Sequence, residues 1–260
     1  MSLSAYITRR RVLSRDNTAY AVKSGGGMED FMIKEKFNIT PLNLFTAVVY
    51  MFCIISLSVT FALNFRPLYY FDIDYLKISE TSGYPTEEIR ANYDALIDYN
   101  SAFNHNELKF PTLSMSEGGR IHFVEVKRIF VFIQYLAVVT LFLAVGLTVL
   151  QRKRRDFGFL KPAAFLTAVL PLILGVLIAL NWDAFFVTFH HLFFNNDYWL
   201  FNPATDPVIT ILPDTFFLHE AILILVCVLG GSLLCFLAGH LRSAAPFECP
   251  GSKKQGAVGK

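Results

Sequence analysis

The chain has 260 residues, 54% of them hydrophobic, with 26 phenylalanines and a formal net charge of +2. Its length alone is compatible with one or two soluble domains, but the distribution of charged residues along the chain excludes that class.

The N-terminal segment, residues 1–42, is basic and has the composition of a disordered segment. Three glycines precede Met28, as expected if a GGAGG ribosome-binding site had been translated. We therefore expect the natural chain to start at Met28, with residues 1–27 not native. N-terminal sequencing of the native protein tests this.

An uncharged stretch of 20 residues, 44–63, follows this segment and predicts the first transmembrane helix. A helix rises 1.5 Å per residue, so about 20 residues cross a hydrocarbon core of about 30 Å. Three more uncharged stretches, 129–150, 162–180 and 221–238, predict three further spans. The expected fold class is an all-α polytopic membrane protein whose four transmembrane helices lie at 43–65, 128–150, 162–181 and 216–240.

The distribution of Lys and Arg predicts the orientation of these helices. Residues 1–42 hold seven, residues 151–161 hold five and the tail after Gly239 holds four. Residues 66–126 hold five against ten acidic residues, and residues 183–218 hold none. Since cytoplasmic loops carry the excess of positive charge, both termini are expected to be cytoplasmic. The cytoplasmic segments are then 1–42, 151–161 and 241–260, and the extracellular segments, 66–127 and 182–215, are expected to form a small cap.

The first extracellular segment is too long for a simple turn. Apolar residues at helical spacing predict a helix over 84–100, with Thr86 as its N-cap. Gly118 and Gly119 are expected to break the chain before a helix that runs into the second span. His122 and Glu125 are three residues apart on that helix and therefore share a face.

Histidine is the residue type that could carry chemistry on the outer side. The sequence has no G-x-S-x-G elbow, H-E-x-x-H motif, P-loop or dinucleotide fingerprint, and its basic residues are too few on that side for nucleic acid. The four cysteines lie in spans or in the inner tail, so no external disulfide framework is expected. Five of the six histidines lie at the outer side: His105, His122, His190, His191 and His219.

Each of these histidines also has a structural interpretation. His122 could be an interfacial polar residue, and only one of His190 and His191, which point about 100° apart on a helix, would face a given cavity. His105 is expected in a loop, and His219 at a helix start or in a structural pair. A zinc site with an open position, formed by His122, one of the adjacent pair and Asp197, is a further alternative.

Two long blocks, "FPTLSMSEGGRIHFVEVKRIF" and "FHHLFFNNDYWLFNPATDPVITILPDTFF", resemble the signature blocks of a bacterial integral membrane family. That family is the lipoprotein intramolecular transacylase (Lit) family, and the resemblance extends over roughly residues 40 to 240. It implies an acyltransferase that moves the sn-2 acyl chain of a diacylglyceryl-modified lipoprotein to the α-amino group of its N-terminal cysteine. The implied partners are diacylglyceryl lipoproteins and membrane lipid, with no metal or other cofactor.

The resemblance also implies that two histidines, one in each block, are catalytic. The matching positions are His122 and His190, with His191 as the alternative for the second, and the sequence does not fix which acts as base. The residues expected to bind or orient the substrate or the histidines are Arg120, Glu125, His191, Asn196, Asp197 and Trp199.

Other functions remain open from the sequence. The protein could be a non-catalytic lipid- or metal-binding membrane module that uses the same histidines. It could also be an acyl hydrolase or a transferase of another lipid, because family membership does not fix the substrate.

Overall fold

The computed structural model describes residues 39–244, and in this part of the chain every regular element is a helix. The expected start at Met28, the segment 1–27 and most of the predicted tail 241–260 lie outside the described residues. Four of the helices are long and apolar enough to cross a membrane: α1 (Pro41–Asn64), α5 (Glu117–Arg154), α6 (Leu160–Leu180) and α9 (Asp214–Ala244). The predicted all-α fold with four membrane-spanning helices is confirmed.

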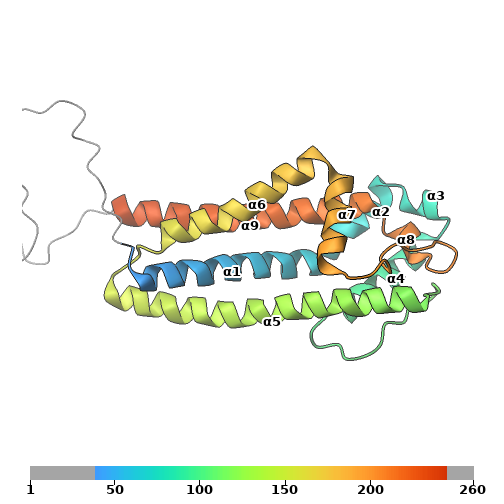
Figure 1. The fold of residues 1–260 in the computed structure, drawn as a ribbon, viewed down its shortest axis with the longest axis horizontal. Coiled ribbons are helices and arrows are strands. Elements are labelled where there is room, and N and C mark those ends of the chain that lie inside the picture. Colours follow the sequence, from blue (N-terminus) through green and yellow to red (C-terminus); the bar gives the residue numbers. More distant parts are fainter. Residues whose placement is uncertain (1–38, 245–260) are drawn as a thin grey trace, which may run out of the picture. The chain divides into compact units, whose positions relative to one another are not determined.

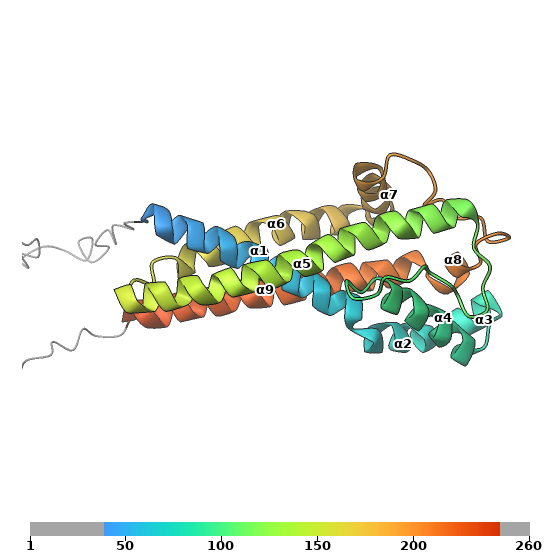
Figure 2. The same cartoon turned by 90° about the horizontal axis from the view of Figure 1, so that it is seen from below.

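Helix α1 lies at the centre of the bundle and packs against α5, α6 and α9, while α6 also runs along α9 (Figures 1 and 2). Only 33% of the most apolar window of α1 and 17% of that of α5 is buried inside the protein. Because the remaining apolar surface needs a non-aqueous environment, the outward faces of these helices are suited to lipid tails. Helix α6 bends away from α9 in its second half, and Pro171 inside the helix is the cause (Figure 1).

A polar network joins α1 to α5 at the end of the bundle away from the cap. The Gln151 side-chain amide donates to Asn43 Oδ1 at 2.8 Å, and Asn43 Nδ2 donates to Asp156 Oδ2 at 3.1 Å. Asn43 and Gln151 are both buried. Buried amides are costly unless they are hydrogen-bonded, so this network fixes how the two helices meet.

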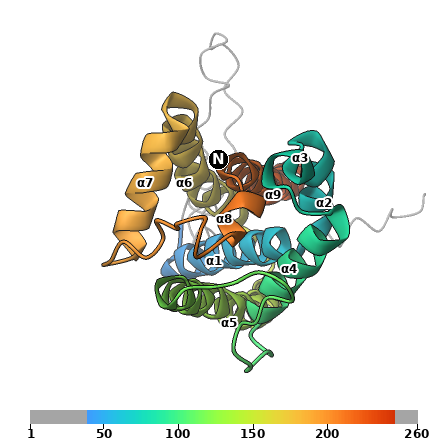
Figure 3. The ribbon, with the colours of Figure 1, turned by 90° about the vertical axis from the view of Figure 1, so that its right-hand side faces the viewer.

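The cap is built from α2 (Arg66–Tyr75), α3 (Ile78–Ser82), α4 (Thr86–Tyr99) and α8 (Val208–Ile211), which gather at one end of the bundle (Figures 1 and 3). Its core is aromatic and aliphatic. Tyr69 and Tyr93 stack with ring centroids 3.7 Å apart, and the Tyr69 hydroxyl donates to the Ile211 carbonyl at 2.6 Å. These contacts tie the two cap segments, which are far apart in the chain, into one unit.

A contact between His219 on α9 and Asp72 on α2 joins the cap to the bundle. His219 Nδ1 lies 2.8 Å from Asp72 Oδ1, so the start of α9 is joined to α2, and Asp72 is fully buried. His219 is therefore in a structural pair, one of the two roles that the sequence offered.

The structure differs from the expected helix starts in two places. The predicted N-cap Thr86 is the first residue of α4, and Pro85 occupies the cap position without a side-chain bond. Gly118 and Gly119 do not break the chain, because α5 begins at Glu117 and contains both glycines. The Ser116 hydroxyl caps α5 by accepting from the Gly119 amide at 3.0 Å.

Candidate active site

His122 projects from the second turn of α5, and the start of that helix is held by a carboxylate from the other cap segment. Asp206 is buried and accepts a hydrogen bond from the Ser116 amide at 2.7 Å. A side chain at Gly119 would overlap Asp206 Oδ1, so only glycine allows this approach. The loop before α8 thereby sets the position of the turn that carries His122.

The His122 imidazole is 6% exposed and lies among aromatic rings. The ring centroids of Phe194 and Phe201 are 4.7 and 5.4 Å from that of His122. Its Nδ1 is buried and has no hydrogen-bond partner within residues 39–244. Such an environment disfavours the charged form of the ring and leaves one nitrogen available to a bound molecule.

His190 lies near the end of α7 (Trp182–Phe193), the helix that follows α6 and crosses toward α1 and α5 (Figure 3). Its Nδ1 is 2.8 Å from the Phe186 carbonyl. Since a carbonyl only accepts, Nδ1 carries the proton, and Nε2 holds the free lone pair in the neutral ring. Burial lowers the pKa of His190 and outweighs the opposing effect of the Phe186 bond.

The two imidazoles, which come from different helices, lie together. Their ring centroids are 6.1 Å apart, with an angle of 29° between the planes. The Trp199 ring stacks on the His190 imidazole, with ring centroids 4.6 Å apart. The Trp199 indole N–H is buried and has no partner in the described part of the chain. The half-buried His190 imidazole, the buried His122 imidazole and an uncommitted N–H donor therefore share one small region.

Glu125 does not bind either histidine but orients the loop that carries Trp199. Both of its carboxylate oxygens accept from Asn196 Nδ2, at 3.0 and 3.2 Å. Asn196 Oδ1 in turn accepts from the Tyr198 amide at 3.1 Å. This chain of bonds holds the turn before Trp199 against α5.

Among the other sequence-predicted site residues, His191 and Asp197 are exposed beside this region, and Arg120 lies away from it. His191 is exposed and presents its ring to the edge of Trp199, with centroids 5.5 Å apart. Asp197 is exposed. Arg120 is two residues before His122 and so lies nearly opposite on the helix, where its Nη2 pairs with Glu117 Oε1 at 2.5 Å.

The zinc alternative lacks a third ligand in this geometry. Across residues 39–244, no three His, Cys, Asp or Glu side chains come together in a way that could hold a metal ion.

Sequence reasoning missed the residues that enclose and position the histidines. Phe186, Phe194 and Phe201 give no signal in a sequence rich in phenylalanine. Asp206 stands in a turn motif, "PATDP", which explains its presence without any contact to the distant Ser116. The adjacent glycines 118 and 119 were the one available signal, because paired glycines at a helix start can mark a close approach by another segment.

The comparisons with known proteins point to one family. The family model described as "Lipoprotein intramolecular transacylase Lit" matches residues 44–217. The structure of the membrane-integral lipoprotein intramolecular transacylase Lit from Bacillus cereus is similar, with a TM-score of 0.76 and 41% identity over 78% of this chain and 94% of that chain. No match was found among curated protein sequences.

Two histidine-substituted variants of the Bacillus cereus protein are also similar, each with a TM-score of 0.71 and 40% identity over 78% of this chain. These matches cover 90% and 92% of the two variant chains. The region matched by the family model, residues 44–217, contains both histidine-bearing blocks, the spans α1, α5 and α6, and the start of α9. The chain is therefore a member of the lipoprotein intramolecular transacylase Lit family of membrane-integral proteins.

Proposed function

We propose that this protein is an intramolecular O-to-N transacylase of bacterial lipoproteins. Its substrate is a lipoprotein whose N-terminal cysteine carries a thioether-linked diacylglyceryl group. The enzyme moves the sn-2 acyl chain to the cysteine α-amino group and leaves a monoacylglyceryl, N-acylated product. The observation that carries this proposal is the pair of imidazoles with ring centroids 6.1 Å apart, within a chain that belongs to the Lit family.

The reaction is balanced within one substrate molecule. The amine nitrogen attacks the sn-2 ester carbonyl, the N–C bond forms, and the C–O bond to glycerol breaks. One proton moves from nitrogen to the glycerol oxygen, and no water is consumed. Since both reacting groups are on one molecule, holding them together supplies much of the rate advantage.

His190 serves as the base in this proposal. The α-amine has a reference pKa near 8, so it must lose a proton for the transfer to be completed. His190 Nε2 has the free lone pair because Nδ1 is bonded to Phe186, and burial keeps the ring neutral. The proton that His190 takes from the amine reaches the leaving oxygen by way of His122, which accepts a proton at one ring nitrogen and gives one up at the other, so both rings end neutral. Positioned acid–base groups of this kind contribute roughly 10²–10⁴ in rate.

Trp199 supports the tetrahedral intermediate. Its buried N–H has no protein partner among the described residues and lies beside His190, so it can donate to the developing oxyanion. Glu125 and Asn196 hold the loop that presents it. His191 and Asp197 lie at the exposed edge, where they contact the lipoprotein backbone or lipid headgroups. Arg120, which Glu117 holds on the other face of α5, has no role in this proposal.

The orientation of the site follows from the charge distribution. The cap segments are poor in Lys and Arg, and the segments at the other end of the bundle are rich in them. We therefore place the cap and the histidines on the extracellular side of a bacterial cell membrane, with both termini in the cytoplasm. Lipoproteins mature on that side.

The test is mass spectrometry of the N-terminal lipopeptide of a reporter lipoprotein, in a host that lacks N-acylation, with and without this protein. We expect the total lipopeptide mass to stay constant while fragment ions move one acyl chain from glycerol to the cysteine amine. His122→Ala and His190→Ala should each reduce the transfer by at least 100-fold.

His105→Ala is the matched control, since His105 is an exposed cap residue, and it should keep full activity. Release of free fatty acid would identify a hydrolase instead. An unchanged diacylglyceryl lipopeptide beside well-expressed protein would favour a non-catalytic module, and either result would overturn the proposal.

A further inference from the structure

Phe103 is the most exposed large hydrophobic side chain among the described residues, at 90%. It lies in the segment between α4 and α5, in a short loop of residues 101–104, here called the anchor loop. Three of the four residues in this loop are small or polar. A single phenylalanine projecting from such a loop is costly in water and favourable at a lipid surface.

The anchor loop is fixed against α5 on both sides of Phe103. Gln134 Oε1 accepts from the Ala102 amide at 3.0 Å, and Gln134 Nε2 donates to the Asn100 carbonyl at 2.8 Å. On the other side, Lys127 Nζ donates to the Asn104 carbonyl at 2.7 Å. These bonds fix the height of Phe103 along the helix.

That height corresponds to the membrane boundary. The uncharged stretch of α5 begins at Ile129, directly after Lys127 and Arg128. Gln134 lies five residues inside it, and helical side chains lean back toward the helix N-terminus. Its Nε2 also donates to the Phe130 carbonyl at 3.2 Å, so the anchor loop is level with the first uncharged turn.

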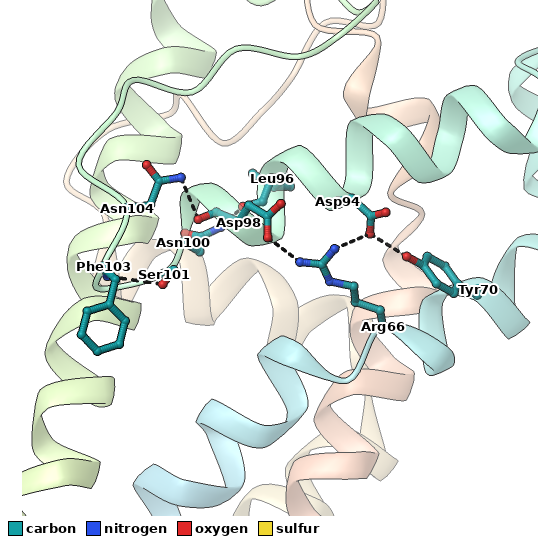
Figure 4. Close-up of polar contacts among 9 residues, drawn as sticks. All are labelled: Arg66, Tyr70, Asp94, Leu96, Asp98, Asn100, Ser101, Phe103 and Asn104. Atoms are coloured by element: carbon teal, nitrogen blue, oxygen red, sulfur yellow. Dashed lines mark hydrogen bonds and ion pairs between the residues drawn. The ribbon is translucent and has the colours of Figure 1, made fainter.

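The Phe103 ring faces away from the polar contacts of the cap. Figure 4 shows it projecting beside α5, away from Arg66 and its carboxylate partners. Arg66 pairs with Asp94 at 3.0 Å and with Asp98 at 2.5 Å. On α5 at nearly the same height, Phe132 and Tyr135 are 65% and 55% exposed. Large apolar side chains are therefore exposed on more than one side of α5 at the height of the anchor loop.

We propose that the anchor loop is a membrane-interface anchor, and that Phe103 inserts into the boundary between phospholipid headgroups and acyl chains. The partner is a phospholipid bilayer. Lys127 and Arg128 lie at the same boundary, where cations meet lipid phosphates. Insertion would hold α4, and with it the cap, at a fixed height above the membrane. This role is separate from the chemistry of the histidines.

The test places p-benzoylphenylalanine at position 103, a conservative exchange for phenylalanine. The protein is reconstituted into vesicles of phosphatidylethanolamine and phosphatidylglycerol, irradiated, and analysed by intact mass spectrometry. We expect adducts heavier by the mass of one phospholipid. The same probe at Glu107 is the matched control, because Glu107 is an exposed, charged residue of the same segment between α4 and α5.

The lipid adduct should be at least fivefold more abundant at position 103 than at position 107. Equal yields at the two positions would overturn the proposal. Cross-linking of position 103 to a second copy of the chain in place of lipid would also overturn it. A nitroxide attached at Phe103→Cys gives an independent depth. Greater collision with oxygen than with a water-soluble nickel chelate supports insertion, and the reverse excludes it.

Discussion

His190 Nδ1 donates its proton to a backbone carbonyl, and this hydrogen bond leaves Nε2 as the ring nitrogen of His190 that can act as a base. The carbonyl belongs to Phe186, one turn earlier on the same helix, so the tautomer is set by α7 itself. Aromatic rings cover both imidazoles and favour their neutral forms. The neutral pair suits proton transfer because one ring can accept while the other donates.

The titration of His190 tests this view of the residue. Burial lowers its pKa from the ordinary value of 6.5, so the neutral ring should persist to lower pH than in a free histidine. The unfolded chain would then bind the proton first, and folding stability should fall as the pH drops below about 6.5. NMR of protein labelled with ¹³C-histidine, assigned with His190→Gln, should give a midpoint below that of a histidine peptide. A midpoint at or above the peptide value would contradict the assignment.

At the scale of elements, the site depends on how the first turn of α5 meets the loop before α8. The Asp206 carboxylate and the Gly119 backbone are in close contact there, and the Ser116 amide donates to the same carboxylate. The helix that carries His122 is therefore placed by a residue 90 positions away in the chain. The other histidine is on α7, a helix without a fully buried residue, so its position depends on ring contacts more than on a deep core.

A methyl group at Gly119 should displace α5 from Asp206. We expect Gly119→Ala to lower both the melting temperature and acyl transfer, the latter at least tenfold, because a shift of about 1 Å in a catalytic group can cost up to 10²-fold. Gly146→Ala is the matched control. Gly146 lies on the same helix, and a Cβ atom there would meet open space. Alanine has a higher helix propensity than glycine, so this substitution should not destabilise α5. Comparable losses in the two variants would show that the close approach is unimportant.

At the scale of the whole bundle, the two ends have separate tasks. The cap end holds the histidines, and the opposite end holds the network of the buried Asn43 and Gln151 with the half-buried Asp156. No proposed step of the reaction uses that network, so it should affect stability alone.

Asn43→Ala should destabilise the protein by about 1–3 kcal/mol, because it leaves the buried Gln151 amide without its main acceptor. Thermal unfolding in detergent measures this loss, and activity per folded molecule should stay within twofold. Asn64→Ala is the control on the same helix, since Asn64 is exposed and its side chain donates to the Thr60 carbonyl one turn away. A large loss of activity in folded Asn43→Ala would show that the two ends are coupled.

The spans could be predicted because lipid imposes a simple demand. A stretch such as 129–150 must lack charged residues and must be long enough to cross the hydrocarbon core. Both properties are visible in the sequence without knowledge of the fold. The pairing of the two signature blocks was also predictable, since each contributes one histidine. The prediction of the spans depends on composition and local order, and that of the histidine pair depends on the resemblance of the two blocks to the Lit family.

The remaining parts of the site depend on contacts between distant residues, which local patterns do not encode. The glycines at 118 and 119 had the pattern of a chain break, but they lie inside α5 because Asp206 approaches there. Arg120 had the pattern of a site residue, but its neighbour Glu117 holds it on the other face of the helix. The stacking of Trp199 on His190 follows from how the loop after α7 folds back.

The contact between Asp206 and Gly119 has a consequence for how related sequences can diverge. A relative with a side chain at position 119 has no room for a carboxylate at position 206, and a relative without that carboxylate has no need for glycine at position 119. The two positions should therefore change together across an alignment of the family, although about a third of the chain's 260 residues separates them. Independent variation at the two positions would mean that the helix start is held in another way.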